Sequence, residues 1–281
     1  MFSVNWWFLM IRRVSQALAP VLFLPHGGGP LPVLGDKGHE EMVSFLKEIA
    51  IELGEPSAIL VISAHWEEKQ ATITSNSQPG IVHDYYGFPA AAYEIQYAAP
   101  GNPALANEIY TLLTAHGIPA KLDEQRGFDH GMFIPLKLMF PQARIPCVQL
   151  SLLNSMNPRI HIALGKAIAA LRNRNILIVG SGMSFHNLKA FFSDMIDGRR
   201  ENEAFDDWLI ETCTDPSILP EVREQRLIEW EKAPFARFCH PREEHLLPLH
   251  VCYGIACADT PTAQTVFNGE IMGRKVTSFL W

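Results

Sequence analysis

Cysteine is scarce in this chain and provides no framework for disulfide bonds. The 281 residues include five cysteines, an odd number, scattered along the sequence in mostly apolar surroundings. Secreted domains that depend on disulfides carry denser, even-numbered sets, so we expect a reduced, cytoplasmic protein. Cys239-His240 lies close to His245 and resembles half of a zinc site, but no second ligand pair follows at a suitable spacing.

An excess of positive charge is also missing. The formal net charge is −7 at pH 7, from 23 basic and 30 acidic side chains. A protein that binds nucleic acid usually presents a basic face, and one that binds anionic membranes usually carries a polybasic stretch. We therefore expect no nucleic-acid partner and no membrane partner, and a monomer or a small homo-oligomer.

The one stretch that resembles a membrane or export signal is too short for either role. Met1–Met10 is apolar, but a membrane helix needs roughly 20 such residues. Arg12 and Arg13 follow this run, whereas a secretory signal places its charge first. We expect residues 1–19 to be an N-terminal extension, or translation to begin at Met10.

Compact metal-binding and nucleotide-binding motifs are absent as well. The chain contains no HExxH, no CxxC pair and no EF-hand loop. Gly27-Gly28-Gly29 follows an apolar run, but its spacing fits neither GxGxxG nor a Walker loop. Positive φ angles and a close backbone approach beside a ligand explain these glycines better than nucleotide binding does.

What the chain does have is a regular alternation of strand and helix patterns, which predicts an α/β fold. We expect one domain over residues 20–281, with a central mostly parallel or mixed sheet, helices on both faces and a metal site at the strand carboxyl ends. Two of the expected helices begin with a cap residue followed by proline, Asn102-Pro103 and Asn157-Pro158. Strands are predicted at 21–24, 59–63, 145–150, 176–179 and 276–279, and helices at 40–53, 102–116, 157–171, 201–232 (with a break near residue 215) and 245–258.

Histidines gather where these strands end. His26 and His65 directly follow two of the apolar runs, and His186 comes a few residues after a third. The carboxyl ends of strands line the ligand crevice of an open α/β sheet, and neutral imidazole is a common ligand of zinc and iron. A lone histidine at a strand end is more often a satisfied, partly buried residue, so the spacing alone leaves both interpretations open.

A series of short motifs resembles one enzyme family. The sequence is similar to the DOPA-type branch of the class III extradiol ring-cleaving dioxygenases, in the superfamily of the protocatechuate 4,5-dioxygenase catalytic subunit. The similarity covers about residues 20–280. The motifs that carry it are His26-Gly27-Gly28-Gly29-Pro30, Ile62-Ser63-Ala64-His65-Trp66, His83-Asp84-Tyr85-Tyr86-Gly87-Phe88-Pro89, Tyr97-Ala98-Ala99-Pro100-Gly101, Gly127-Phe128-Asp129-His130-Gly131, Val148-Gln149-Leu150-Ser151, Gly182-Met183-Ser184-Phe185-His186-Asn187-Leu188 and Glu244-His245-Leu246-Leu247-Pro248-Leu249.

The resemblance implies a metal centre and assigns its ligands. His26, His65 and His245 would bind the ion, with Glu243 or Glu244 as an alternative third ligand. Extradiol cleavage needs Fe(II) with open cis positions, so Fe(II) is expected for catalysis. An all-histidine site also suits zinc, so zinc is expected in the purified protein.

Two further histidines would serve the chemistry. The resemblance places His186 either as a fourth metal ligand or as the acid–base residue, with the ligand role favoured in the resting enzyme. His130 would be a catalytic residue that hydrogen-bonds the substrate oxygens, oriented by Asp129, unless it only caps a helix. His39, His116, His161 and His240 are expected at the surface.

The function implied is extradiol ring cleavage of a catechol such as DOPA, with a histidine-bound non-heme metal and O₂. A zinc-dependent hydrolase and a non-catalytic metal-binding relative are the alternatives. His130 and His186 argue against the second alternative, because a structural site would not need them.

Overall fold

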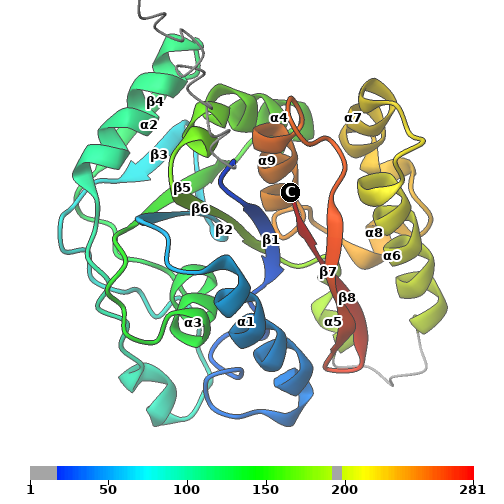
Figure 1. Ribbon diagram of the computed structural model, residues 1–281. Coiled ribbons are helices and arrows are strands. Elements are labelled where there is room, and N and C mark those ends of the chain that lie inside the picture. The colour runs from blue at the N-terminus through cyan, green and yellow to red at the C-terminus, as the bar shows by residue number, and fades with distance from the viewer. Residues whose placement is uncertain (1–17, 192–197) are drawn as a thin grey trace, which may run out of the picture.

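A computed structural model describes residues 18–191 and 198–281, and residues 1–17 of the expected N-terminal extension lie outside the described residues. The described residues form an α/β domain around one eight-stranded sheet with the order β4-β3-β5-β2-β6-β1-β8-β7 (Figure 1). The strands are β1 (Val21–Pro25), β2 (Ala58–Glu68), β3 (Ala71–Thr74), β4 (Ala120–Asp123), β5 (Cys147–Leu153), β6 (Ile176–Gly182), β7 (Gln264–Ile271) and β8 (Arg274–Leu280).

The helices confirm the alternating pattern for most of the chain. Asn102 caps α2 by accepting a hydrogen bond from the backbone of Leu105, and Asn157 caps α4 in the same way. The α-helices are α1 (Glu40–Leu53), α2 (Pro103–Ala115), α3 (His130–Met139), α4 (Pro158–Ala167), α5 (Leu188–Phe191), α6 (Arg199–Thr214), α7 (Pro220–Ile228), α8 (Ala236–Cys239) and α9 (Leu247–Ala256).

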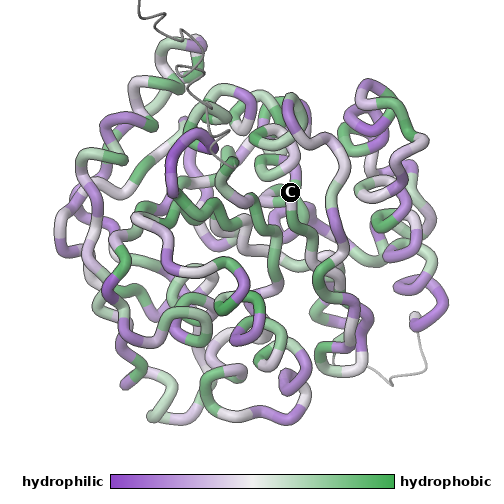
Figure 2. The backbone as a smooth tube through the Cα atoms, in the orientation of Figure 1, coloured by the Kyte–Doolittle hydropathy of each residue, from purple (hydrophilic) through white to green (hydrophobic). Residues whose placement is uncertain are grey.

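The middle of the sheet is parallel and fully buried. β5, β2, β6 and β1 run side by side in the same direction, and every residue of β1, β5 and β6 is buried. Near-continuous apolar runs are what a parallel sheet covered on both faces requires. Figure 2 shows the hydrophobic colour concentrated on these strands. The outer pairs β3/β5, β1/β8 and β7/β8 are antiparallel, so the sheet is mixed.

Two adjacent residues of β6 show that helices cover both faces. The Oγ of Ser181 donates a hydrogen bond to the carbonyl of Gly131 at the start of α3. A Cβ on the preceding residue, Gly180, would collide with Cys252 and the backbone of Pro248 in α9. Successive side chains of a strand point to opposite faces, so α3 and α9 lie on opposite sides of the sheet. Glycine at this point of β6 lets α9 approach the strand closely.

Some elements differ from the sequence-based expectation. The helix α3, the strands β3 and β4 and the hairpin strand β7 were not expected, and β2 continues five residues beyond Ser63. Pro135 lies inside α3, and proline in a helix interior normally signals a break. The β3 and β4 strands are four residues long and β7 is largely exposed, so none carries a strong apolar pattern.

The C-terminal hairpin joins the N-terminal strand. β8 lies between β1 and β7, and Leu22 and Phe23 pair with Leu280 and Phe279 in antiparallel register. Within residues 18–191 and 198–281, no helix has the length and apolar character that crossing a membrane would require.

Candidate metal centre

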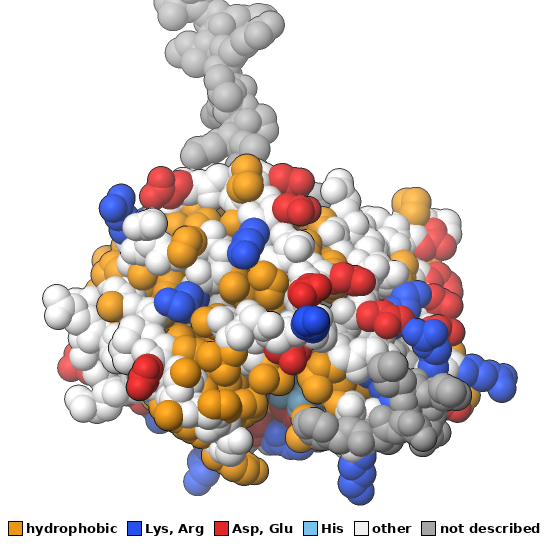
Figure 3. All heavy atoms as spheres, turned by 90° about the horizontal axis from the view of Figure 1, so that it is seen from below, with side chains coloured by type: hydrophobic (Ala, Val, Ile, Leu, Met, Phe, Trp, Pro, Cys, Tyr) orange, Lys and Arg blue, Asp and Glu red, His pale blue; other side chains and the backbone are white. Residues whose placement is uncertain are grey.

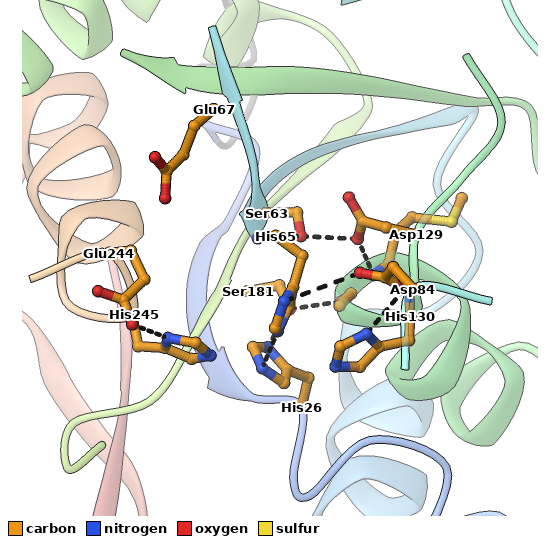
Figure 4. A network of polar contacts seen from close by, with 12 residues as sticks. His26, Ser63, His65, Glu67, Asp84, Asp129, His130, Ser181, Glu244 and His245 are labelled. Carbon is orange, nitrogen blue, oxygen red and sulfur yellow. Dashed lines mark hydrogen bonds and ion pairs between the residues drawn. The ribbon is translucent and has the colours of Figure 1, made fainter. Parts of the chain in front are cut away.

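Three segments that are distant in sequence bring their histidines to one point. His26 follows β1, His65 lies on β2, and His245 precedes α9 by two residues. One ring nitrogen of each imidazole can be chosen so that the three atoms lie within 4.8 Å of one another. Figure 4 shows the three rings close together, with His65 on β2 and Glu67 farther along the same strand. The convergence expected from the sequence is therefore present in the structure.

One detail of this expectation was wrong. His65 does not follow its strand but lies within β2, which pairs with β5 again at Glu67 after an irregularity in register. The polar residues His65, Glu67 and Glu68 hid this extension, because an apolar run is the sequence signal of a buried strand. The extension also brings Glu67 toward the site (Figure 4).

Each of the three imidazoles has an oxygen atom near its Nδ1, at hydrogen-bond distance for His26 and His245. His26 Nδ1 lies 3.0 Å from Ser181 Oγ. Because the Ser181 hydroxyl donates its proton to the Gly131 carbonyl, its oxygen must accept from His26. His245 Nδ1 lies 3.0 Å from a carboxylate oxygen of Glu244, and His65 Nδ1 lies 3.8 Å from Asp84. Carboxylate or hydroxyl partners on one ring nitrogen leave the other with a free lone pair, as in most histidine metal sites.

The inward-facing nitrogens have the spacing of metal ligands. The Nε2 atoms of His26 and His65 lie 3.0 Å apart. Two nitrogens bound to one tetrahedral ion at about 2.1 Å would lie about 3.4 Å apart. In Figure 4 the second ring nitrogen of His245 points toward these two atoms. The donor set and its spacing fit a zinc or iron ion.

Burial keeps all three imidazoles neutral. Desolvation holds the pKa of His26 and of His245 well below the ordinary value of 6.5, and the other histidines of the cluster lower both further. The pKa of His65 is also well below 6.5, because burial and His130 outweigh the opposing effect of Asp84. A metal ligand must be neutral imidazole, so these residues are ready to bind a cation near pH 7.

His130 lies beside the three, at the first position of α3. Its ring centroid is 3.8 Å from that of His65 and 5.4 Å from that of His26. Its Nδ1 lies 2.9 Å from Asp84, and its backbone N–H donates to the same carboxylate oxygen over 3.0 Å. Burial would raise the pKa of Asp84, but these interactions with His130 lower it to about 2. Asp84 is therefore ionised, and one of its oxygens holds both the ring and the backbone N–H of His130.

The expectation that Asp129 orients His130 was wrong. Asp129 is the N-cap of α3 and accepts from the backbone of Met132. Its carboxylate also accepts from the Ser63 hydroxyl over 2.7 Å and from the side-chain amide of Gln149. Burial raises its pKa. Asp129 thus fixes the start of α3, and Asp84, from a distant loop, contacts the imidazole.

His186 stacks on His245 and shares its carboxylate. The two ring centroids are 3.4 Å apart and the ring planes differ by 17°. The Nδ1 of His186 lies 3.2 Å from the same Glu244 oxygen that binds His245. One candidate ligand atom each of His186, Glu244 and His245 lie within 4.8 Å of one another. Glu243 instead forms an ion pair with Arg237 at 2.6 Å. Of the two carboxylates weighed as ligands, only Glu244 thus contacts these imidazoles.

The glycine turn after β1 is held by a buried histidine. His39 accepts a hydrogen bond from the backbone N–H of Gly28 and pairs through its other nitrogen with Asp36 at 2.7 Å. Gly27 and Gly29 have φ angles of 80° and 59°, as expected for glycine beside a site. A Cβ on Gly27 would collide with Pro32 and His39. His39 was therefore wrongly expected at the surface.

Two other histidines expected at the surface are also buried. His161 binds the backbone of Leu153 and Asn157, and His240 binds the Ser184 carbonyl over 2.9 Å. These rings can be buried because backbone N–H and carbonyl groups form hydrogen bonds with their nitrogens. His116 alone of the four is exposed. Cys239 contacts the Glu201 carbonyl, so it and His240 face different partners.

The mouth of the site is lined with aromatic and apolar side chains. Figure 3 shows the face toward which β1 points, with histidine at the bottom of a hollow bordered by hydrophobic side chains. The ring centroid of Tyr85 lies 5.6 Å from that of His130 and 5.6 Å from that of Phe88. The Phe88 ring lies next to Gly29, 3.2 Å from where a Cβ would stand. Tyr86 is 90% exposed. Such a rim suits a flat aromatic molecule.

Comparison with known proteins agrees with this geometry. Residues 20–278 match the family described as the catalytic LigB subunit of aromatic ring-opening dioxygenase. The chain belongs to the LigB family. Its matched range covers every histidine of the centre, so this LigB-family protein is an enzyme, an extradiol ring-opening dioxygenase.

Curated relatives and one solved structure extend the LigB assignment. The dioxygenase tasH of Hapsidospora irregularis is 38% identical over 95% of this chain and 86% of its own length. The 4,5-DOPA dioxygenase extradiol of Beta vulgaris is 37% identical over 88% of this chain and 90% of its own length. The crystal structure of an uncharacterized protein of Escherichia coli K12 matches with a TM-score of 0.73 and 30% identity, covering 93% of this chain and 99% of that one.

Proposed function

We propose that this LigB-family enzyme opens the ring of a catechol such as DOPA, using O₂ and an iron ion held by His26, His65 and His245. The observation that carries the proposal is the convergence of three neutral imidazoles, two of which, His26 and His245, have an oxygen partner 3.0 Å from Nδ1. Relatives from Beta vulgaris and Portulaca grandiflora, both 37% identical, carry the name 4,5-DOPA dioxygenase extradiol.

The metal supplies a template for the two reactants and stabilises negative charge on them when it is bound. The chain's own residues supply proton transfer and orientation. His130 has its Nδ1 on Asp84, and its other ring nitrogen faces His26 and His65 (Figure 4). That nitrogen accepts the proton that a catechol hydroxyl loses on binding. Asp84, ionised at neutral pH, stabilises the imidazolium that results.

His186 has two roles in this proposal. Its Nδ1 faces Glu244, so its Nε2 is the atom available for a ligand or a proton. In the resting enzyme His186 would be a fourth ligand beside His245, on which it stacks. When substrate binds, His186 would leave this position, take the proton of the second catechol hydroxyl on its Nε2 and return that proton to the product. A ligand must be neutral and an acid protonated, so the roles follow one another.

The choice between iron and zinc follows from affinity and chemistry. A nitrogen site generally binds Zn(II) more tightly than Fe(II), so the protein purified without added iron would hold zinc. Ring cleavage by O₂ needs the iron form. Metal analysis of protein purified with and without iron in the growth medium tests this assignment.

The activity is tested by anaerobic reconstitution with Fe(II), followed by measurement of O₂ uptake with DOPA, other catechols and a monophenol. We expect uptake with catechols only, in a ratio of one O₂ per ring opened. The zinc form and the metal-free protein should consume no O₂. Hydrolysis of ester or amide substrates by the zinc form, with no O₂ uptake by the iron form, would instead establish a zinc hydrolase.

The remaining features of the proposal concern the protein as a whole. Residues 20–281 form the catalytic domain and residues 1–19 an extension, as the family match over residues 20–278 supports. Its five cysteines are free and four are buried, which supports a reduced cytoplasmic location. Light scattering would determine whether the protein is a monomer or a small homo-oligomer.

A further inference from the structure

Among the described residues, Glu244 is the carboxylate that contacts two imidazoles of the cluster through the same oxygen. Its Oε1 lies 3.0 Å from His245 Nδ1 and 3.2 Å from His186 Nδ1. The side chain is 13% exposed, and its second oxygen, Oε2, is buried without a hydrogen bond. An ionised carboxylate can only accept hydrogen bonds, so both Nδ1 atoms must carry protons.

A second layer holds Glu244 in place. Arg242 reaches Glu67 on β2 with two parallel hydrogen bonds of 2.6 Å each. The same guanidinium lies 3.6 Å from the buried Oε2 of Glu244. Bidentate arginine–carboxylate pairs are strong and fix geometry. Arg242 therefore ties the carboxylate beside His245 to the strand that carries His65.

We propose that Glu244 is a positioning residue that sets the tautomer of both His245 and His186. The Glu67–Arg242 pair fixes the position of its carboxylate relative to β2. With both Nδ1 atoms protonated, both Nε2 atoms present lone pairs to the centre. The inference rests on the proposed function only in taking Nε2 of His245 as a ligand atom. It adds a network that connects His245, just before α9, to β2 through Glu244, Arg242 and Glu67.

The variant Glu244→Gln tests the inference, with Glu243→Gln as its matched control. Glutamine keeps the shape but has one acceptor oxygen and no charge, so it cannot hold both Nδ1–H groups equally. Glu243 is the adjacent residue and pairs with Arg237 instead of an imidazole. Long-range ¹H–¹⁵N NMR of the metal-free proteins reports the tautomers, and titration with Zn(II) reports the affinity.

In the wild type, His186 and His245 should both be Nδ1–H tautomers. In Glu244→Gln at least one should become the Nε2–H form or a mixture, and Zn(II) affinity should fall by about 10–100-fold. Glu243→Gln should match the wild type in both measurements. Unchanged tautomers and affinity in Glu244→Gln would overturn the inference.

Arg242→Gln tests the second layer and leaves the carboxylate in place. Arg242 is 52% exposed, so its replacement should leave the fold intact. We expect a smaller loss of Zn(II) affinity than in Glu244→Gln, and wild-type affinity would overturn the role of the pair. A wild type that bound no metal would overturn the proposed function, whereas the tautomers of the metal-free protein would still test Glu244.

Discussion

His26 and His65 face each other through Nε2 atoms that lie 3.0 Å apart, although one follows β1 and the other lies on β2. Two neutral imidazoles that both point lone pairs at this distance repel each other, unless a proton or a cation lies between them. The Nδ1 proton of His26 is already committed to Ser181. The lone pair on His26 Nε2 therefore needs either a proton from His65 Nε2 or a cation between the two nitrogens.

Metal binding should for this reason stabilise the protein strongly. At 100 times the dissociation constant, a ligand adds about 2.7 kcal/mol to the free energy of unfolding. For a domain of this size that is a rise in Tm of roughly 5–10 °C. Scanning calorimetry with Zn(II) and with EDTA measures the difference. The variant His245→Ala should show no such rise, and an equal rise would indicate a site elsewhere.

His130 and His245 should differ in what their removal costs. His245→Ala deletes a candidate ligand, so metal content and turnover should both collapse. His130→Ala leaves the three ligands, so metal should stay while turnover falls by about 10²–10⁴-fold, the usual range for general acid–base help. Metal analysis and O₂ uptake of each variant distinguish the two. Loss of metal in His130→Ala would make His130 a ligand, and full activity would leave it only a structural role.

Replacing Asp84 should affect His130 more than the metal ligands, because the carboxylate lies 2.9 Å from His130 Nδ1 but 3.8 Å from the Nδ1 of the ligand His65. Asp84→Asn removes the charge that faces His130 Nδ1, so turnover should fall by about 10–100-fold while bound metal remains. Asp123→Asn is the control, because Asp123 caps a turn at Gln125 and Arg126. If Asp84→Asn turned over as fast as the control, Asp84 would have no role in the reaction.

Gly182→Ala should displace His245. A Cβ on Gly182 would collide with the carbonyl oxygen of His245, which also accepts from the backbone of Met183 over 2.9 Å. We expect a lower Tm and a Zn(II) affinity reduced by about tenfold or more, since a ligand must move. Gly80→Ala is a fair control because open space surrounds a Cβ there. Equal affinity of the two variants would show that the segment can shift without cost to the centre.

Buried neutral histidines should make the metal-free protein sensitive to acid. Burial lowers the pKa of His161 to about 4 despite its hydrogen bond to Asn157. Between pH 6.5 and 4 the unfolded chain therefore binds a proton there that the folded chain does not. As the pH is lowered through this range, this residue should reduce the free energy of unfolding by about 1.4 kcal/mol per pH unit. Urea unfolding at pH 5, 5.5 and 6 gives the free energy of unfolding as a function of pH. The slope of this free energy against pH should be smaller by this amount in His161→Gln than in the wild type, and identical slopes would contradict the prediction.

The regular elements were predictable because they repeat a simple pattern. β1 is a continuous apolar run, α1 shows the apolar period of a helix, and Asn102-Pro103 marks the start of α2. The helix α3 was not predictable, since Pro135 interrupts it and nearly all its residues are buried. A helix that is apolar on all sides has no period to detect.

The centre was predictable in its ligand candidates but not in the partners that orient them. Asp129 adjoins His130 in sequence, yet Asp84 contacts its ring. Ser181 reaches His26 from β6, and Arg242 pairs with Glu67 on β2. Such contacts depend on sheet order and on strand register, and neither leaves a mark in the local sequence.

The pairing of β1 with β8 bears on the order of events during biosynthesis. Leu22 finds its partner, Leu280, only when the last described strand is made. His245 leaves the ribosome about 10–40 s after His26, at about 5–20 residues per second. Until then a nascent chain offers only two of the three candidate ligands, on an unfinished sheet, which is a poor trap for a metal ion. A translation product that ended before His245 should therefore bind the ion weakly.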